Sequence, residues 1–387
     1  MAKSKSKSEL EDALANTLAD SINKQFKGQA LKTAFFLSGD DDSPSNVKEW
    51  VSSGCDSLDL AISNRPNGGF PVGRITEITG LEASGKSLLA SHTLAETQKK
   101  GGLAVYIDTE SATSSEFLQA IGVDLKTMLY VPLETIEEIF ETIETIVEGV
   151  RKSNKDRLVT IVVDSIMGAS TKIEMAAEYD KDGYATSKSI ILSKAMRKVT
   201  NWIARENICL IFTNQLRTKL GVSFGDQWTT SGGKAIPFHA SVRLRIKNTG
   251  MIKAKINGIE QVVGSKTEVQ VVKNRMGPPH RKVNYEIYYD SGIDNYGGWL
   301  ETMKKFDLVK QSGAHYTLED VDTETGEVFS EIKFQSKNFI DKVINHPEIK
   351  NRLYQRICDA YIFKYQAGID GGIDDVIIID EVYDEEG

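Results

Sequence analysis

Short apolar runs alternate with longer amphipathic segments through the middle of the chain. The apolar runs are 74–79, 103–108, 158–163 and 208–213. The segments between them, which repeat apolar residues at helical spacing, are 87–100, 113–121, 134–151 and 187–206. Strands that alternate with helices are typical of a parallel sheet, because the crossover between parallel strands is long enough to hold a helix. The pattern therefore predicts an α/β fold with a mostly parallel central sheet.

Both flanks of this region show other patterns. Near the N-terminus an apolar stripe at intervals of four predicts an amphipathic helix with Leu10, Leu14, Leu18, Ile22 and Phe26. A strand is expected after it, over 30–37. Beyond residue 238 polar and apolar positions alternate, which predicts strands over 240–246, 260–263, 268–273 and 284–289. Helices are expected near 297–306 and 336–365.

These patterns divide the chain into four predicted parts. Residues 1–38 are an arm of one helix and one strand, and 39–291 are the core with the parallel sheet. A small α/β domain is expected over 292–366, followed by an acidic tail over 367–387. An acidic linker with Ser and Pro separates the arm from the core. The arm therefore needs a surface to pack on, either its own core or a neighbouring subunit.

Composition excludes several classes of protein. The 387 residues are 40% hydrophobic and 26% charged, as in ordinary globular proteins. No apolar run reaches the ~18 residues of a membrane span, and the N-terminus lacks the apolar region of a secretory signal. The three cysteines are scattered without metal-ligand spacing, so a reducing, cytoplasmic location is expected.

The net charge of −8 comes from the C-terminal tail. Residues 370–387 hold eight acidic residues and no Lys or Arg. Removing these eight from the 55 Asp and Glu leaves 47, which equals the number of Lys and Arg. The body of the protein is therefore neutral, and the overall charge does not exclude a nucleic-acid partner.

Residues 80–87, Gly-Leu-Glu-Ala-Ser-Gly-Lys-Ser, match the phosphate-binding loop G-x-x-x-x-G-K-[ST]. An apolar strand precedes them and a helical pattern follows, which is the context that this loop requires. The glycines let successive backbone N–H groups point at one anion, and the positive end of the helix adds to that field. Lys86 is placed to reach the phosphates and Ser87 to hold Mg²⁺. We interpret the chain as a nucleotide-binding protein.

Polar residues follow the other three apolar runs. Asp164 ends one of them, where a carboxylate beside a P-loop can hold Mg²⁺. Asp108 and Glu110 end another, and one of the two is expected to orient or deprotonate an attacking water. Asn214 and Gln215 follow the last run. An amide at this position can detect the γ-phosphate by hydrogen bonding.

The loop over 216–236 is rich in Gly and hydroxyl residues and has basic residues at both ends. Structureless loops of this length are uncommon in compact domains, which favours a functional role. Backbone amides, hydroxyls and cations suit contacts with a phosphate backbone better than the reading of base edges. The loop is therefore a candidate segment for contact with a phosphate chain.

Together these residues resemble the bacterial RecA family of ATP-dependent DNA strand-exchange proteins. The resemblance runs from about residue 10 to 365. Beyond 80–87 it includes Val163-Asp164-Ser165 and Asn214-Gln215-Leu216-Arg217. Its other motifs are 53–54, 57–59, 194–198, 221–225, 229–233, 240–244 and 271–274. It implies a RecA-like P-loop NTPase core that forms a filament of identical subunits on single-stranded DNA and pairs it with homologous duplex DNA.

The resemblance also implies roles for single residues. ATP would lie between subunits with Mg²⁺ held by Ser87 and Asp164, and Glu110 rather than Asp108 would activate water. The implied catalytic residues are Glu110, Lys86 and Gln215. The implied cofactor-binding residues are Gly80, Glu82, Ala83, Ser84, Gly85, Lys86, Ser87, Leu88, Phe117, Asp164, Lys273, Arg275 and Tyr289. Of these, the two cations Lys273 and Arg275 would reach the ATP of the neighbouring subunit.

The implied DNA contacts are Arg197, Arg217, Gly232, Gly233 and Lys234. Gln215 would couple ATP to the DNA loop at 216–236, and a second DNA loop would lie near 176–186. The chain departs from the family pattern in that second loop, which is acidic. It also departs at Arg275, where the family has Lys, and at Glu268 and Gln270, where the family tends to carry basic residues.

Two alternatives use the same core. One is a ring-forming helicase or motor ATPase, and the other is a regulator that binds ATP without hydrolysing it. Lys86 and Glu110 argue against the regulator. The N-terminal helix and strand and the unit after Gly292 favour a filament over a ring. The function expected is therefore that of a DNA-dependent ATPase that catalyses strand exchange in recombination and repair, encoded by a cell or a phage.

Overall fold

The computed structural model describes residues 7–26, 33–36, 43, 45–153, 156–177, 185–218, 228–230 and 232–365. They belong to two compact units, Met1–Lys48 and Glu49–Gly387, which we describe separately. Two expectations lie mostly or wholly outside the described residues. These are the second DNA loop at 176–186 and the acidic tail at 367–387.

The N-terminal unit contains helix α1 (Lys7–Gln25), as predicted. Its exposed apolar side chains are those of Leu14, Leu18 and Ile22. After the helix, Oδ1 of Asn23 accepts the backbone N–H groups of Thr33 and Ala34 at 2.8 and 2.9 Å. The prediction of a strand over 30–37 is wrong for the described residues 33–36, because a side chain and not a strand takes these N–H groups.

The main sheet of the second unit has ten strands within the described residues. In chain order they are β3 (Ile75–Gly80), β4 (Leu103–Asp108), β5 (Leu129–Pro132), β6 (Val159–Asp164), β7 (Ile208–Thr218), β8 (Trp228–Thr230), β9 (Val242–Ile256), β10 (Ile259–Asn274), β11 (Lys282–Tyr288) and β12 (Gly292–Ile293). Their order in the sheet is β12-β11-β10-β9-β3-β7-β6-β4-β5, and β8 pairs with β7. The strands from β9 to β5 are parallel, which confirms the predicted architecture.

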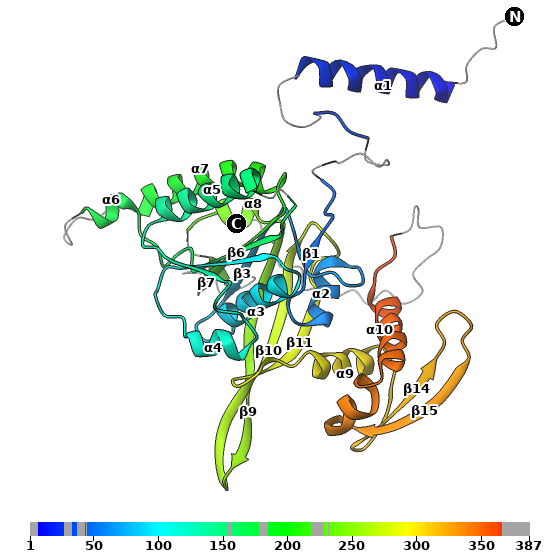
Figure 1. The fold of residues 1–387 in the computed structure, drawn as a ribbon. Helices are drawn as coiled ribbons and strands as arrows, with labels where there is room; N and C mark the ends of the chain where they lie inside the picture. The colour runs from blue at the N-terminus through cyan, green and yellow to red at the C-terminus, as the bar shows by residue number, and fades with distance from the viewer. Residues whose placement is uncertain are drawn as a thin grey trace, which may run out of the picture. The chain divides into compact units, whose positions relative to one another are not determined.

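Helices cover both faces of this sheet (Figure 1). One face carries α2 (Asp56–Ser63), α3 (Lys86–Lys99) and α4 (Ser115–Ala120). The other carries α5 (Ile136–Ser153), α7 (Ala185–Ile203) and α8 (Ala235–His239). The four helices predicted between the strands appear as α3, α4, α5 and α7. Among the described residues, no helix combines the length and apolar character needed to cross a bilayer.

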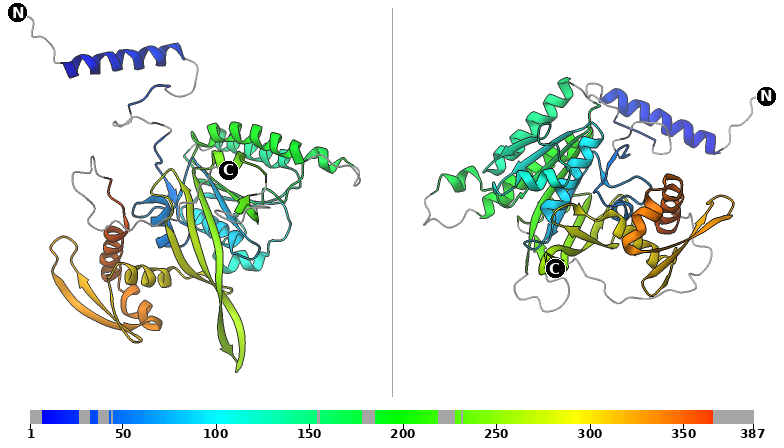
Figure 2. Two further views of the ribbon diagram at one scale, coloured as in Figure 1. Left: turned by 180° about the vertical axis from the view of Figure 1, so that it is seen from behind. Right: turned by 60° about the horizontal axis from the view of Figure 1, so that its bottom comes forward.

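Strands β9 and β10 continue beyond the sheet as a two-stranded ribbon (Figures 1 and 2). The prediction of separate strands over 240–246, 260–263 and 268–273 is therefore wrong: the last two belong to one strand, and 247–256 is also a strand. No residue from 247 to 263 is buried. With both faces in solvent, the ribbon lacks the polar–apolar alternation on which strand prediction depends.

Within the second unit, the C-terminal part, which we call the C-terminal unit, begins with α9 (Asn295–Lys305). A three-stranded antiparallel sheet follows, of β13 (Lys310–Ser312), β14 (His315–Val321) and β15 (Val328–Gln335). The prediction of one helix over 336–365 is wrong. The segment contains a 3₁₀ turn (Ser336–Asn338), a π turn (Ile340–Ile344) and α10 (Pro347–Tyr361). Pro347 starts a new helix because its missing N–H group is tolerated only in a first turn.

His92 links α3 to β12 at the edge of the main sheet. It is buried, and its Nε2 accepts the backbone N–H of Ile293 at 3.1 Å. Gly292 leaves room for the ring, since a Cβ there would lie 2.3 Å from Nε2. Burial lowers the pKa of His92 to about 4, and the charge of Lys99 acts in the same direction.

We expect protonation of His92 to destabilise the fold in acid. Its folded pKa of about 4 lies below the ordinary 6.5, so its contribution to stability is complete above pH 6.5 and is lost as the pH falls toward 4. Urea unfolding at pH 7.5 and pH 5 checks this. Between these pH values the wild type should lose roughly 2 kcal/mol more than H92Q, which keeps a hydrogen-bond acceptor. Equal losses would show that His92 does not carry the effect.

Candidate nucleotide-binding site

The carboxyl ends of β3, β4, β6 and β7 meet at one edge of the sheet, because these strands are parallel. Gly80 on β3 pairs with Gln215 on β7, and Asp108 on β4 pairs with Asp164 on β6. Ligands of α/β sheets bind outside this edge. The fold thus brings together the P-loop and the polar strand ends identified in the sequence.

The loop over 80–87 depends on glycine at two positions. A Cβ on Gly80 would lie 2.4 Å from Oγ of Ser84 and 2.7 Å from the backbone oxygen of Ile246. Gly85 precedes α3 with φ 98°, and Ala83 also has a positive φ of 53°. Left-handed residues in such a loop turn successive N–H groups toward one anion.

Lys86 is folded back over the loop, where its Nζ donates to the carbonyl of Leu81 at 2.6 Å. Partial burial lowers the pKa of Lys86, and the charges of Asp164, Glu110 and Glu82 act in the opposite direction. The ammonium group therefore lies in the field of the carboxylates at the strand ends.

Two cavities flank the loop, with volumes of about 280 and 340 Å³. Ser87 and Phe117 line both of them. The first is also lined by Glu110 and Asp164, and the second by residues 83–88 and Tyr289. Of the predicted cofactor-binding residues, Gly80, Glu82, Lys273 and Arg275 line neither cavity.

Asp164 is held by two hydroxyl groups. The Tyr106 hydroxyl donates to Oδ2 at 2.7 Å, and the Thr213 hydroxyl donates to Oδ1. Burial raises the pKa of Tyr106, and the charge of Asp164 acts in the same direction. The phenol therefore stays protonated and donates. We did not predict Tyr106 or Thr213 from the sequence, where the only signal is a hydroxyl residue near the end of an apolar strand.

The two carboxylates after β4 have different surroundings. Asp108 is buried; its Oδ1 accepts the N–H groups of Glu110 and Ser111 at 2.9 Å, and its Oδ2 accepts the Tyr130 hydroxyl at 3.0 Å. It holds the turn in place. Glu110 is exposed, and its Oε1 accepts the hydroxyl of Ser165 at 3.0 Å. The geometry therefore favours Glu110 for chemistry and Asp108 for structure.

The candidate DNA loop starts on the strand that carries Gln215. Beyond Gln215, β7 continues to Thr218 and pairs with β8, so that Arg217 lies opposite Thr229. Residues 219–227 and 231 lie outside the described part of the chain. Gly232 packs on the segment after β6, where a Cβ would come within 2.5 Å of Sδ of Met167. The described ends of the loop thus form a hairpin next to the sheet edge that carries the P-loop.

The predicted cations fall into two groups. In the first group, burial lowers the pKa of Lys188, and the charge of Arg217 lowers it further. At the end of α8, burial lowers the pKa of His239, and three nearby cations lower it further: Arg197, Lys273 and Arg275. Arg197, predicted as a DNA contact, therefore acts on the same histidine as the predicted ATP contacts Lys273 and Arg275. Lys234, at the start of α8, is exposed.

Arg275 lies at the edge of the sheet opposite the P-loop. Its N–H donates to the carbonyl of Ser241 at 2.9 Å, and the N–H of Ser241 donates to the carbonyl of Ile75 at 2.8 Å. Ile75 begins β3 and Gly80 ends it, so at ~3.3 Å per residue the two edges are about 17 Å apart. Arg275 is thus too far away to contact phosphates at the P-loop of its own subunit.

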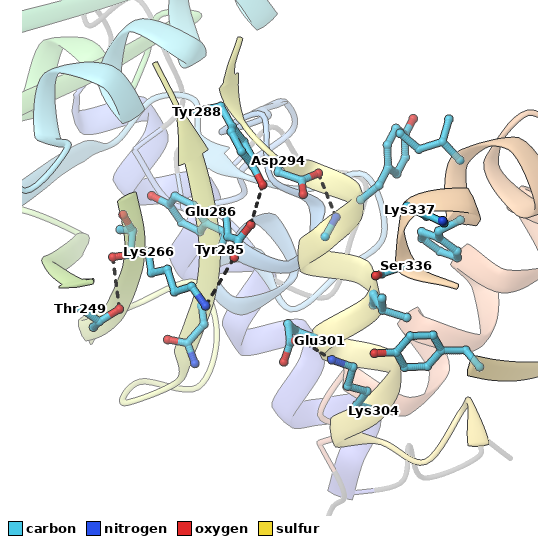
Figure 3. Close-up of a pocket in the computed structure, with 18 residues that line it drawn as sticks. Thr249, Lys266, Tyr285, Glu286, Tyr288, Asp294, Glu301, Lys304, Ser336 and Lys337 are labelled. Carbon is cyan, nitrogen blue, oxygen red and sulfur yellow. Dashed lines mark hydrogen bonds and ion pairs between the residues drawn. The ribbon is translucent and has the colours of Figure 1, made fainter. Parts of the chain in front are cut away.

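A third cavity, of about 880 Å³, lies between the sheet and the C-terminal unit (Figure 3). Its charged residues largely pair with one another. Nζ of Lys266 lies 3.7 Å from Oε1 of Glu286, and Nζ of Lys304 lies 2.6 Å from Oε1 of Glu301. The Tyr288 hydroxyl also donates to Glu286 at 2.9 Å. This pairing leaves no concentration of positive charge for phosphates, so the edge with the P-loop is the stronger candidate for the nucleotide site.

Comparison with known proteins gives the same assignment. The family model of the RecA N-terminal domain matches residues 12–294. Protein RecA of Cereibacter sphaeroides is 36% identical over 366 residues, which cover 94% of this chain and 98% of the relative. Protein RecA of Brucella canis is 39% identical over 269 residues, 70% of this chain and 71% of the relative. The chain therefore belongs to the RecA family of ATP-binding, DNA-dependent ATPases that carry out homologous recombination.

Proposed function

We propose that the protein polymerises on single-stranded DNA with one ATP between each pair of adjacent subunits, and that the filament pairs this DNA with a homologous duplex. The observation that carries the proposal is the position of the cations. The P-loop lies at one edge of the sheet, whereas Arg275 lies at the other. A head-to-tail contact brings the two edges of neighbouring subunits together and propagates into a filament when the rotation does not close.

Two exposed apolar surfaces support this contact. Phe238, whose side chain is 70% exposed, is next to Lys273, whose Nζ donates to the carbonyls of Pro237 and Phe238 at 2.7 and 3.1 Å. The stripe of α1 is also exposed, with Leu14 at 62%. Exposed apolar patches mark interaction sites. We place both in the contact between subunits, with the arm over 1–38 on the neighbouring core.

Hydrolysis of ATP would use groups around both cavities that flank the P-loop. Lys86 would hold the phosphates, and Glu110 would orient the attacking water and accept its proton. Ser87 and Asp164 supply the hydroxyl and carboxylate oxygens that Mg²⁺ prefers, and both line the first cavity. Bound there, the ion would neutralise charge on the phosphates. Phe117 and Tyr289 would pack against the adenine.

Coupling to DNA follows from Gln215. A change in the position of its side chain would move β7 and the hairpin that begins the DNA loop. Arg217, Lys234 and the amides of Gly232 and Gly233 would contact the phosphate backbone, with Arg197 further along α7. Base pairing between the DNA strands, not the protein, would read the sequence. DNA binding is therefore expected to weaken strongly with salt.

Mixing two inactive variants tests whether the ATP site is shared. K86A lacks the P-loop cation, and K273A/R275A lacks the cations proposed to come from the neighbour. Each alone should hydrolyse almost no ATP. In an equimolar filament about a quarter of the interfaces join an intact P-loop to intact cations, so activity should return to roughly that fraction of the wild type. A mixture that assembles on DNA and stays inactive would show that each subunit builds its own site.

A further inference from the structure

Glu77 is a fully buried carboxylate on β3, the strand that leads into the P-loop. Its Oε2 accepts Nε of Arg243 on β9 at 2.6 Å, and its Oε1 accepts Nδ2 of Asn214 on β7 at 2.9 Å. One side chain thus joins three adjacent strands. Losing a partner would leave a buried charge uncompensated, so the three groups are held together strongly.

Asn214 directly precedes Gln215 in β7. Successive residues of a strand point to opposite faces of the sheet. Phe212 and Asn214 therefore share the face covered by α7 and α8, and Gln215 points to the face of α3 and the P-loop. Glu77 is not among the groups in contact with either nucleotide cavity. By holding Asn214, it fixes the backbone from which Gln215 projects.

The other end of the network lies near the proposed subunit interface. Arg243 on β9 is directly opposite Lys273 on β10, and the two strands pair along their length with three interruptions of the register. Lys273 in turn donates to the carbonyls of Pro237 and Phe238 in α8. A shift of β9 and β10 against β3 would therefore pull Arg243 and, through Glu77, the amide of Asn214.

We propose that Glu77 is a positioning residue that couples the cations at the subunit interface to the nucleotide sensor Gln215. This role rests on the proposed function, since it requires that ATP between subunits changes the affinity for DNA. When Lys273 engages the neighbour's ATP, the displacement of β9 reaches Gln215 through the buried carboxylate. Glu77 touches neither ATP nor DNA in this scheme.

The test compares two variants, because either buried change alone can disturb folding. N214L keeps the size of the side chain and the pair between Glu77 and Arg243 but removes the bond to Asn214. E77Q keeps an acceptor and removes the charge. The matched control is T79V, which removes the bond from Thr79 to the carbonyl of Leu244 at 2.8 Å, another buried link between β3 and β9.

The readout is the affinity for a labelled single-stranded oligonucleotide with an ATP analogue and with ADP, measured by fluorescence anisotropy. We expect the ratio of the two affinities to fall at least tenfold in N214L and E77Q, with no further fall in the double variant. Nucleotide binding should change less than threefold, and T79V should keep the wild-type ratio.

The possible failures are distinguishable. If the wild type responds to the nucleotide and N214L and E77Q respond equally well, the role of Glu77 is wrong and the proposed function stands. If T79V loses the response as much as they do, the effect is one of general packing and the role of Glu77 is again wrong. If the DNA affinity of the wild type is the same with the ATP analogue and with ADP, the proposed function is wrong, and the role of Glu77, which rests on it, is wrong too.

Discussion

The K86A variant should lose ATP hydrolysis by at least ~100-fold and should no longer bind DNA in response to ATP. Lys86 is the cation of the loop over 80–87, and it lies in the field of Asp164 and Glu110. Without it, the phosphates would face these two carboxylates with one cation fewer to balance them. Hydrolysis, nucleotide binding and DNA-dependent assembly are measured on the same preparation.

Its control is K99A, on the same helix. Lys99 is exposed at the end of α3, where its Nζ pairs with Glu96 at 2.6 Å, and it lines neither nucleotide cavity. K99A should hydrolyse ATP at the wild-type rate. K86A should also melt within a few degrees of the wild type, because the hydrogen bond that it loses, from Lys86 to the carbonyl of Leu81, is exposed to solvent. Activity of K86A within tenfold of K99A would show that this loop is not the ATP site.

E110Q should lose ATP hydrolysis, whereas D108N should lose stability. Glu110 is the exposed carboxylate of the cavity, so E110Q should lower kcat by about 10²–10⁴-fold and leave nucleotide binding and stability unchanged. Asp108 accepts three backbone N–H groups and a tyrosine hydroxyl, so D108N should cost about 1–3 kcal/mol of stability. Steady-state kinetics and thermal unfolding separate the two effects.

The two variants together also show which carboxylate, Glu110 or Asp108, acts as the general base. If D108N removed hydrolysis at full stability while E110Q stayed active, the assignment would be reversed. If both variants only lost stability, neither residue would activate water and the base would have to be sought elsewhere around the cavity.

The sequence predicts the parts of the fold that depend on local patterns. The P-loop has a fixed spacing, and the parallel strands are buried on both faces, so their apolar runs end where Asp108 and Asp164 begin. Parallel pairing then brings these ends to one edge without further information. For this reason the residues around the nucleotide edge could be named before the fold was known.

Contacts between distant segments could not be predicted in this way. Tyr106 and Thr213 lie in apolar strands, and only the register of β4, β6 and β7 directs both hydroxyls to Asp164. Glu77 is a charged residue within an apolar run, and its sequence context does not indicate its partners, which are 137 and 166 residues away. The ribbon of β9 and β10 was missed for a different reason: backbone pairing, not burial, makes it a strand.

The most direct test of the account is electron microscopy of the purified protein on long single-stranded DNA with a slowly hydrolysed ATP analogue. We expect continuous helical filaments in which the DNA is extended, and no such filaments with K273A/R275A. Closed rings around the DNA would contradict it and favour a ring-forming motor on the same core. Filaments that K273A/R275A forms equally well would contradict the shared ATP site.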